Sequence, residues 1–259
     1  MLLNDAVALV TGAGSGIGRE IALRLAEEGA DVALAGRSLD SMRDVAQRVI
    51  ALGRNALVVP LDLRDAGSIA AAAATVLERF GRVDVLVNNG GVGGPSRQLA
   101  DVTAEEWEDT FRVNVTGTFL CCRAFLPQMM QRGSGAIVVI GSITGKRPLV
   151  NRAPYAASKA ALIGLVRTLA AEVGPYGVRV NLVSPGGVAG QRLDWVIENQ
   201  AKARGLTPEQ VREEFAGGSA LRRLVSPGDV ADMTAFLASP RAAAVTGEDV
   251  NVAGGLVMY

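Results

Sequence analysis

Four polar side chains in the central part of the chain are of types that can move a proton together: Asn114, Ser142, Tyr155 and Lys159. Tyr155 and Lys159 are four residues apart, so they share one face wherever this segment is helical. A free phenol has a pKa of about 10, and lowering it to about 7 requires roughly 4 kcal/mol of selective stabilisation of the phenolate. A neighbouring ammonium group favours that ionised form. The pattern indicates acid and base chemistry at Tyr155, although an isolated Y-x-x-x-K is also common as a surface pair.

The chain contains no histidine. Without an imidazole, Ser-His-Asp and Cys-His nucleophilic systems are excluded, and so are histidine-ligated metals. General acid and base work near neutral pH therefore falls to Tyr, Lys, Asp or Glu.

Length and composition predict one globular domain over residues 1–259, with no nucleic-acid or membrane partner. No linker, repeat or low-complexity tract interrupts the 259 residues. Lys plus Arg and Asp plus Glu both number 26, which leaves no basic excess for a phosphate backbone. There is no signal-peptide pattern, and no uncharged apolar run approaches the ~20 residues that span a bilayer. Cys121 and Cys122 are neighbours that cannot close an ordinary disulfide loop, and we expect a cytoplasmic protein.

Short β-branched apolar runs alternate with longer segments of helical period. The predicted strands are Val7 to Thr11, Asp31 to Ala35, Ala56 to Pro60, Val83 to Asn88, Ala136 to Ile140, Val178 to Val183 and Asp249 to Val252. The predicted helices are Gly18 to Glu28, Leu39 to Leu52, Ala66 to Phe80, Thr103 to Met130, Tyr155 to Val173 and Pro227 to Ala238. This alternation predicts a single-domain, Rossmann-type α/β fold, a doubly wound parallel sheet of about seven strands with helices on both faces. In such folds the site lies beyond the carboxyl ends of the strands.

A glycine-rich turn, Thr11-Gly-Ala-Gly-Ser-Gly-Ile-Gly18, joins the first strand to the first helix. Its glycines allow backbone amides to approach a pyrophosphate, which the positive helix end also attracts. A structural turn without a ligand is the alternative. The position of the turn at the first strand-helix junction favours a dinucleotide site.

The second strand runs into Gly36-Arg37-Ser38, where the adenosine ribose of a dinucleotide would lie. No carboxylate is present to accept from a ribose 2′-hydroxyl, whereas Arg37 can bind a 2′-phosphate bidentately. The sequence therefore favours NADP(H), with NAD(H) still possible. A solvated surface arginine is the alternative interpretation of Arg37.

The spacing of Gly12, Gly16 and Gly18 resembles the TGxxxGxG turn of the short-chain dehydrogenase/reductase family. Asn88-Asn-Gly-Gly91 is similar to the family's Asn-Asn-Ala-Gly, and the four polar residues follow in the family's order and approximate spacing. The resemblance covers essentially the whole chain. It implies an oxidoreductase that transfers a hydride between a nicotinamide cofactor and a secondary alcohol or ketone, with a small-molecule substrate and no metal. Together with the apolar helices at 116–130 and 160–171, it also implies a homotetramer.

The resemblance implies a role for each site residue. Tyr155 would give or take the hydroxyl proton, and Ser142 would hydrogen-bond the substrate oxygen. Lys159 would bind the nicotinamide ribose and lower the tyrosine pKa, and Asn114 would hold a water in the proton relay. Asp62 stands where the family contacts the adenine amino group, although capping of the helix near Ala66 is the alternative. The predicted cofactor contacts are Gly12, Ser15, Gly16, Ile17, Gly18, Arg37, Asp62, Leu63, Asn89, Gly90, Tyr155, Lys159, Pro185, Gly186 and Val188.

Besides Gly90, which replaces the alanine of Asn-Asn-Ala-Gly, three positions depart from the family pattern. Gly190 stands where family members usually carry a threonine that contacts the nicotinamide amide, and Ala253 replaces the aspartate of Val-Asp-Gly-Gly. These two changes put cofactor affinity and subunit packing in doubt. Ser15 replaces a basic residue that many NADP(H)-dependent relatives carry, so the preference for NADP(H) should be modest.

The segment Gln191 to Gly218 has helical character, and in the family this region is a mobile lid over the substrate, which we place at 188–220. Its Arg192, Trp195 and other charges are also explained by a purely structural pair of amphipathic helices. Polyols, sugar acids, cyclic ketones and 3-oxoacyl thioesters are all open as substrates. A non-catalytic dinucleotide-binding sensor is the alternative function, and an epimerase would need a second domain for which the chain is too short.

Overall fold

Seven strands form one sheet in the computed structural model, which describes residues 1–259. The strands are β1 (Val7–Thr11), β2 (Asp31–Gly36), β3 (Ala56–Pro60), β4 (Val85–Asn88), β5 (Gly135–Ile140), β6 (Val178–Pro185) and β7 (Asp249–Val252). They lie in the order β3-β2-β1-β4-β5-β6-β7, and every neighbouring pair is parallel. The predicted fold class is confirmed.

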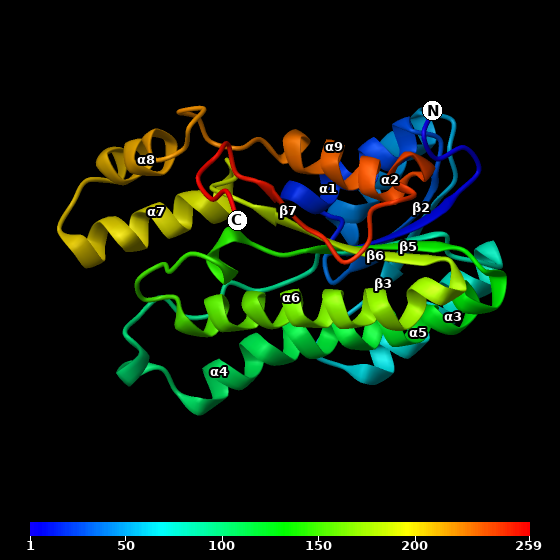
Figure 1. The fold of residues 1–259 in the computed structure, drawn as a ribbon, viewed down its shortest axis with the longest axis horizontal. Coiled ribbons are helices and arrows are strands. Elements are labelled where there is room, and N and C mark those ends of the chain that lie inside the picture. The colour runs from blue at the N-terminus through cyan, green and yellow to red at the C-terminus, as the bar shows by residue number, and fades with distance from the viewer.

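Helices cover both faces of the sheet (Figure 1). The helices are α1 (Gly16–Glu27), α2 (Leu39–Ala51), α3 (Ala66–Phe80), α4 (Ala104–Phe111), α5 (Gly117–Arg132), α6 (Ala153–Val173), α7 (Gln191–Arg204), α8 (Pro208–Gly217) and α9 (Pro227–Ala238). Short 3₁₀ turns lie at Leu99–Asp101, Ile143–Gly145, Gly174–Tyr176 and Pro240–Ala242. One core cluster includes buried residues of α1, α2 and α9, and a second includes residues of α3, α5 and α6. Because the sheet is covered on both faces, its strands are continuous apolar runs rather than alternating ones.

The strand order reverses between β1 and β4. From β1 the chain adds β2 and β3 on one side, then returns to place β4 on the other side of β1. In open parallel sheets this reversal leaves a crevice at the carboxyl ends of the two central strands. The glycine-rich turn follows β1, and Asn88-Asn-Gly-Gly91 lies at the end of β4, so the topology brings the two motifs to one crevice.

The helix predicted over Thr103 to Met130 is interrupted, which corrects the sequence expectation. It begins with the predicted capping box, in which Thr103 and Glu106 each satisfy the other's backbone amide. A π-helical turn over Arg112–Thr116 then separates α4 from α5. Such turns widen the backbone locally and often mark functional positions. Asn114 lies inside this turn.

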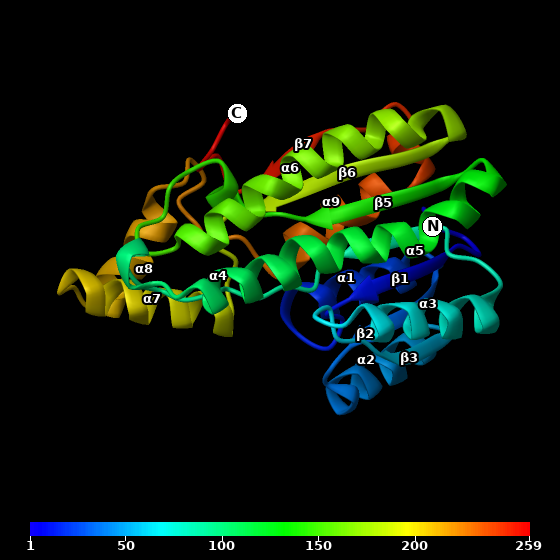
Figure 2. The ribbon, with the colours of Figure 1, turned by 90° about the horizontal axis from the view of Figure 1, so that it is seen from below.

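The segment predicted to be helical after β6 forms α7 and α8, which lie beyond the carboxyl ends of the strands (Figure 2). A capping box at Thr207 starts α8. The two helices share a small core of their own, formed by Leu193, Ile197, Ala201 and Val211. They are therefore held to each other by apolar packing as well as by their link to the sheet.

Both cysteines are buried free thiols on α5. Burial raises the pKa of Cys121 and of Cys122 to about 12, so neither is a thiolate at neutral pH. None of the helices combines the length and apolarity that crossing a lipid bilayer requires.

Candidate functional site

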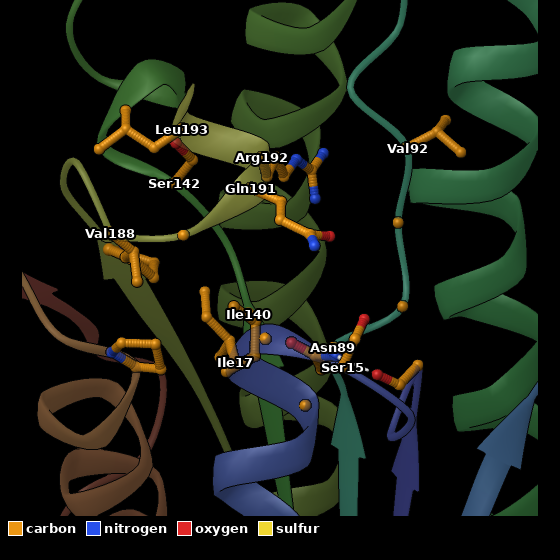
Figure 3. A pocket seen from close by; sticks show the side chains of 18 of the residues that line it. Ser15, Ile17, Asn89, Val92, Ile140, Ser142, Val188, Gln191, Arg192 and Leu193 are labelled. Carbon is orange, nitrogen blue, oxygen red and sulfur yellow. Dashed lines mark hydrogen bonds between the residues drawn. The ribbon is translucent and has the colours of Figure 1, made fainter. Parts of the chain in front are cut away.

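A cavity of about 850 Å³ opens at the carboxyl ends of the strands. Figure 3 shows part of its lining, with Ser15 and Ile17 at the glycine turn, Ser142 after β5, and Arg192 at the start of α7. All the predicted cofactor contacts line it, and so does Ser142. Asn114 is the one predicted site residue that does not. The sheet order thus gathers into one cavity residues that are far apart in the sequence.

The glycine turn is shaped by close backbone approaches. Gly12 has a φ of +66°, a left-handed conformation that favours glycine. A Cβ at Gly18 would lie 2.2 Å from the carbonyl oxygen of Gly12, so no side chain fits there. Ser15 precedes α1, and no side chain caps this helix end. Uncapped amides at a helix N-terminus that faces a cavity fit a pyrophosphate group.

The end of β4 is tied to the glycine turn by hydrogen bonds. The Asn89 side-chain amide donates to the carbonyl oxygens of Thr11 (2.9 Å) and Gly12 (3.2 Å). The Thr11 hydroxyl accepts from the backbone N–H groups of Asn89 (3.0 Å) and Gly90 (2.9 Å). Thr11 was not among the predicted site residues, although its place at the end of β1 could have indicated it. Asn89 and Thr11 together fix the width of the crevice between β1 and β4.

The end of the cavity beyond β2 is open and polar. Arg37 is exposed, lines the cavity and forms no ion pair, so its guanidinium is available to an anion. Asp62 also lines the cavity, and its carboxylate accepts from the backbone N–H of Arg64 at 3.0 Å. The N-cap of α3 is Asp65, which accepts from Gly67. Helix capping therefore does not account for Asp62.

Tyr155 and Lys159 lie on the first turns of α6 and face the cavity. The Lys159 ammonium is 5.8 Å from the centroid of the Tyr155 ring and donates to the carbonyl oxygen of Ile140 at 2.8 Å. Ser142 follows β5, and its hydroxyl accepts from the backbone N–H of Thr144 at 3.1 Å. Since Ile140 and Ser142 belong to the same strand end, α6 and β5 together position the group.

The pKa of Tyr155 lies below its usual value. Burial raises the pKa of this phenol, but the positive charges of Arg192 and Lys159, the Ser142 hydroxyl and the charge of Arg152 outweigh that effect. The pKa of the Lys159 ammonium is also lowered, because it is buried. A phenol whose ionised form is favoured by nearby cations can exchange a proton closer to neutral pH than a free tyrosine can.

Asn114 does not line the cavity itself but is hydrogen-bonded to residues that form its wall. Its Oδ1 accepts from the backbone N–H of Val92 at 2.8 Å, and its Nδ2 donates to the Val92 carbonyl and to the Ser158 hydroxyl, each at 3.0 Å. Both amide hydrogens are thereby used inside the protein. Ser158 in turn donates to the carbonyl oxygen of Tyr155 at 2.8 Å. Asn114 thus connects the loop after β4 to the first turn of α6.

Two arginines contact the Tyr155 ring, and sequence reasoning did not place either of them there. Arg152 is the N-cap of α6, and Arg192 was considered only as part of the lid segment. Their guanidinium carbons lie 5.1 Å and 5.5 Å from the ring centroid. The spacing of Arg152 three residues before Tyr155 was an available signal, because residues three apart are neighbours on a helix.

The structure shows the surroundings of Gly190 and Ala253, two of the residues that depart from the family pattern. Gly190 precedes α7 with a φ of +137°, a conformation that residues with side chains rarely adopt. It lines the cavity and, being glycine, offers it only backbone atoms. Ala253 is buried with Ile143 and Val257 in a small apolar cluster. An aspartate at 253 would place a carboxylate in that cluster.

Comparison with known proteins agrees with this geometry. The family model described as Enoyl-(Acyl carrier protein) reductase matches residues 12–257. A putative ketoacyl reductase of Streptomyces coelicolor is 40% identical over 257 residues, which cover 98% of this chain and 97% of that protein.

Two solved structures extend the comparison. The structure of an NAD⁺-bound xylitol dehydrogenase has a TM-score of 0.95 and 32% identity, covering 98% of this chain and 100% of that one. The structure of a variant of the actinorhodin polyketide ketoreductase with NADPH has a TM-score of 0.94 and 39% identity, covering 98% of both chains. The sequence similarity extends over nearly the full length, and the fold is the same. Together with the cavity at the strand ends, these findings assign the chain to a family. The chain is an NAD(P)-dependent oxidoreductase acting on alcohol or ketone groups, and it belongs to the short-chain dehydrogenase/reductase family.

Proposed function

We propose that this enzyme moves a hydride between its cofactor and a secondary alcohol or ketone by means of Tyr155, Lys159, Ser142 and Asn114. The observation that carries the proposal is the lowered pKa of Tyr155 in a cavity that also contains the glycine turn. The two named structures hold NAD⁺ and NADPH, which supports a nicotinamide cofactor in the corresponding cavity. A sensor that only binds the dinucleotide would have no need of a phenol tuned in this way.

The proton transfer is assigned to Tyr155. Its hydroxyl gives a proton to a ketone oxygen or takes one from an alcohol, while the Ser142 hydroxyl hydrogen-bonds the same oxygen. Lys159 favours the phenolate through its charge, and it would bind the cofactor's ribose. Asn114 connects Val92 to the first turn of α6 by hydrogen bonds, and it would hold a water in the proton relay. When bound, the nicotinamide supplies the hydride or accepts it.

The cofactor is assigned to the crevice between β1 and β4. The uncapped end of α1 and the glycines at 12, 16 and 18 would hold its pyrophosphate. Asp62 would contact the adenine amino group, and Arg37 would bind a 2′-phosphate. We therefore propose a preference for NADP(H) with NAD(H) also accepted.

The assignment extends to the whole chain. Residues 1–259 are one dinucleotide-binding and catalytic domain, and the segment 188–220, which contains α7 and α8, is the substrate lid. The position of these helices beyond the strand ends supports that role. We place the enzyme in the cytoplasm.

The active form is a homotetramer. Large apolar residues of α4, of α5 and of the turn after α6 remain exposed, with Trp107 at 37%, Phe119 at 43% and Tyr176 at 48% exposure. Light scattering at micromolar concentration should report four chains per particle, and a monomer there would exclude the assembly.

The function is tested by a screen of alcohols and ketones against both cofactors, followed at the absorbance of the reduced nicotinamide. The names of the relatives point to ketoacyl compounds and polyols, so both belong in the screen with cyclic ketones. Cofactor-linked turnover that disappears in Tyr155→Phe is the expected result. Cofactor binding without turnover of any compound would favour the sensor.

A further inference from the structure

A buried cation without a counterion lies beside Tyr155. Arg152 is 2% exposed, and only its Nη2 has a partner, the carbonyl oxygen of Gly93 at 2.8 Å. Its Nε and Nη1 are buried and have no hydrogen-bond partner. No carboxylate forms an ion pair with Arg152, although the chain contains 15 ion pairs elsewhere. Burying a charge without a partner is costly, so this site calls for an anion that the protein itself does not provide.

A second arginine converges on the same place. A Cβ at Gly93 would lie 3.0 Å from the Nη2 of Arg152 and 3.7 Å from the Nη2 of Arg192, so the two guanidinium groups meet at this glycine. Arg192 also forms no ion pair. Figure 3 shows its side chain extending from the start of α7 into the space between Ser142 and Val92. The two like charges repel each other, and an anion bound between them would offset that repulsion.

The Arg152 guanidinium is held in place by aromatic rings. It lies 5.1 Å from the centroid of Tyr155 and 5.3 Å from that of Trp195, which is on α7. The neighbouring segment is docked on α7 as well, because the Gln200 side chain donates to the Val150 carbonyl at 2.9 Å. Stacked arginines lose less freedom when they bind an oxyanion. Arg152, Arg192 and Trp195 thus form a fixed cationic corner, and both arginines line the substrate cavity.

A purely electrostatic role for this corner is the competing explanation. The remaining charged groups that face the Tyr155 ring are cationic, since Lys159 is the third charge within 6 Å of it. An electrostatic role would use only the charge of Arg152 and would leave the N–H groups of its Nε and Nη1 without acceptors. A bound oxyanion would use the charge and also accept from these N–H groups.

We propose that the substrate of this enzyme carries an oxyanion, in its simplest form a carboxylate, which Arg152 and Arg192 bind a few bonds from the reacting carbon. The proposal rests on the proposed function, which places the reacting oxygen at the Tyr155 hydroxyl. The guanidinium groups lie against the ring of that same residue, so an anion that reaches them is close to the reacting carbon. Hydroxy acids and oxo acids are the substrate class that fits, in preference to neutral polyols and ketones.

The experiment compares acids with their neutral amides on the full chain at low ionic strength. The kinetic pairs are 3-hydroxybutanoate with 3-hydroxybutanamide, and 2-hydroxycyclohexanecarboxylate with its amide. The binding pair is benzoate and benzamide, titrated by calorimetry into the protein saturated with cofactor, which requires no turnover. We expect kcat/KM and affinity to favour the acids by roughly 10- to 100-fold.

Variants of the arginines separate binding from activation of Tyr155. Arg152→Met should reduce kcat/KM for the acids roughly 10- to 100-fold more than for the amides, whose smaller loss reports the effect of the Arg152 charge on Tyr155, and it should reduce benzoate affinity without reducing benzamide affinity. Arg152→Lys, which keeps the charge, should recover part of the loss. Arg192→Gln changes an exposed side chain, and the difference between its losses for acids and for amides tests the same site if Arg152→Met does not fold. Arg147→Met is the matched control, because Arg147 is exposed, unpaired and outside the cavity lining.

Three results would overturn the proposal. The first is equal kinetics and equal binding for acids and amides in the parent enzyme. The second is a loss in Arg152→Met that is the same for acids and amides, which would assign the arginine to the electrostatics of Tyr155 alone. The third is turnover of neutral alcohols or ketones without turnover or binding of any acid. That third result would leave the proposed function intact, whereas cofactor binding with no turnover of any compound would refute the function, and the benzoate titration would still decide the anion site.

Discussion

The two ends of the cavity are built by different means. At the cofactor end, close backbone approaches set the shape, as between Gly18 and the Gly12 carbonyl, and the one free cation, Arg37, is exposed. At the substrate end, side chains determine the environment, with the buried Lys159 and Arg152 and the exposed Arg192 of α7 beside Tyr155. Backbone recognition suits a ligand common to a whole family, whereas side chains can change from one relative to the next.

This difference predicts how substitutions at the two ends separate. At the substrate end, changes of Arg152, Arg192 or the Tyr155 hydroxyl should alter turnover and its pH dependence while cofactor affinity is kept. Changes at the cofactor end should alter affinity and the choice of dinucleotide while the pH dependence is kept. A substitution at one end that changed a property assigned to the other end would show that the two ends are coupled.

The largest effect is expected for Tyr155→Phe. Loss of the hydroxyl removes the proton donor and acceptor, which is worth roughly 10²- to 10⁴-fold in turnover. The cofactor dissociation constant, measured by quenching of protein fluorescence, should change little because the hydroxyl makes little contact with the dinucleotide. Turnover within about threefold of the parent would remove Tyr155 from the catalytic assignment.

Gly18→Ala should act at the other end of the cavity. Its Cβ would meet the Gly12 carbonyl oxygen at 2.2 Å and the Asn89 Nδ2 at 2.4 Å, so the turn must shift. We expect cofactor affinity to fall roughly 10- to 100-fold and stability to fall by about 1–3 kcal/mol. Titration calorimetry and urea unfolding measure the two effects.

Gly164→Ala is the matched control for that substitution. Gly164 lies inside α6, and a Cβ there meets nothing within 4 Å. Alanine is favoured over glycine in a helix by roughly 0.5–1 kcal/mol, so this variant should be at least as stable as the parent. Equal losses of cofactor affinity in Gly18→Ala and Gly164→Ala would contradict the conclusion that close backbone approaches shape the glycine turn.

Arg37→Ala should change the choice between the two cofactors. One exposed contact between arginine and phosphate, partly screened by salt, corresponds to roughly tenfold to a hundredfold in the ratio of specificity constants. Ser15 supplies no second cation, which favours the lower value. Steady-state kinetics with NADP(H) and NAD(H) give the ratio for parent and variant. A parent that favours NAD(H), or an unchanged ratio in the variant, would leave Arg37 as a solvated side chain.

The smallest effect is a change in pH dependence. Because cations lower the pKa of Tyr155, alcohol oxidation should reach its plateau below the pH at which a free phenol ionises. The charge of Arg192 lowers the Tyr155 pKa more than that of Lys159 or Arg152, so Arg192→Gln should destabilise the phenolate and raise the apparent pKa of kcat/KM. Oxidation would slow near neutrality and recover at higher pH.

The pH profile needs a charge-matched comparison. Arg192→Lys keeps the positive charge and should restore most of the parent profile, while Arg147→Gln should leave it unchanged. Identical profiles for parent and Arg192→Gln would show that Arg192 does not act on Tyr155.

The sequence by itself determined the strand and helix order, and every cofactor contact that it predicted lines the cavity. Apolar β-branched runs specify buried strands, and a glycine-rich turn between a strand and a helix is a local feature that spacing alone reveals. The boundaries of β1, β3 and β7 and of α3 and α9 were predicted to the residue for the same reason, since turn and capping residues mark them locally.

The tertiary structure decided what depends on contacts between distant segments. The helix predicted over Thr103 to Met130 breaks at a π-helical turn, because there Asn114 bonds Val92 and Ser158, and no periodicity within the segment encodes those partners. The spacing of Arg152 before Tyr155 indicated only that the two residues could be neighbours. The significance of Arg152 arises only when α7 and the loop after β4 enclose it, leaving two donors unpaired beside Tyr155. Preferences for strand, helix or turn depend on neighbouring residues, whereas burial and charge environment are properties of the folded chain.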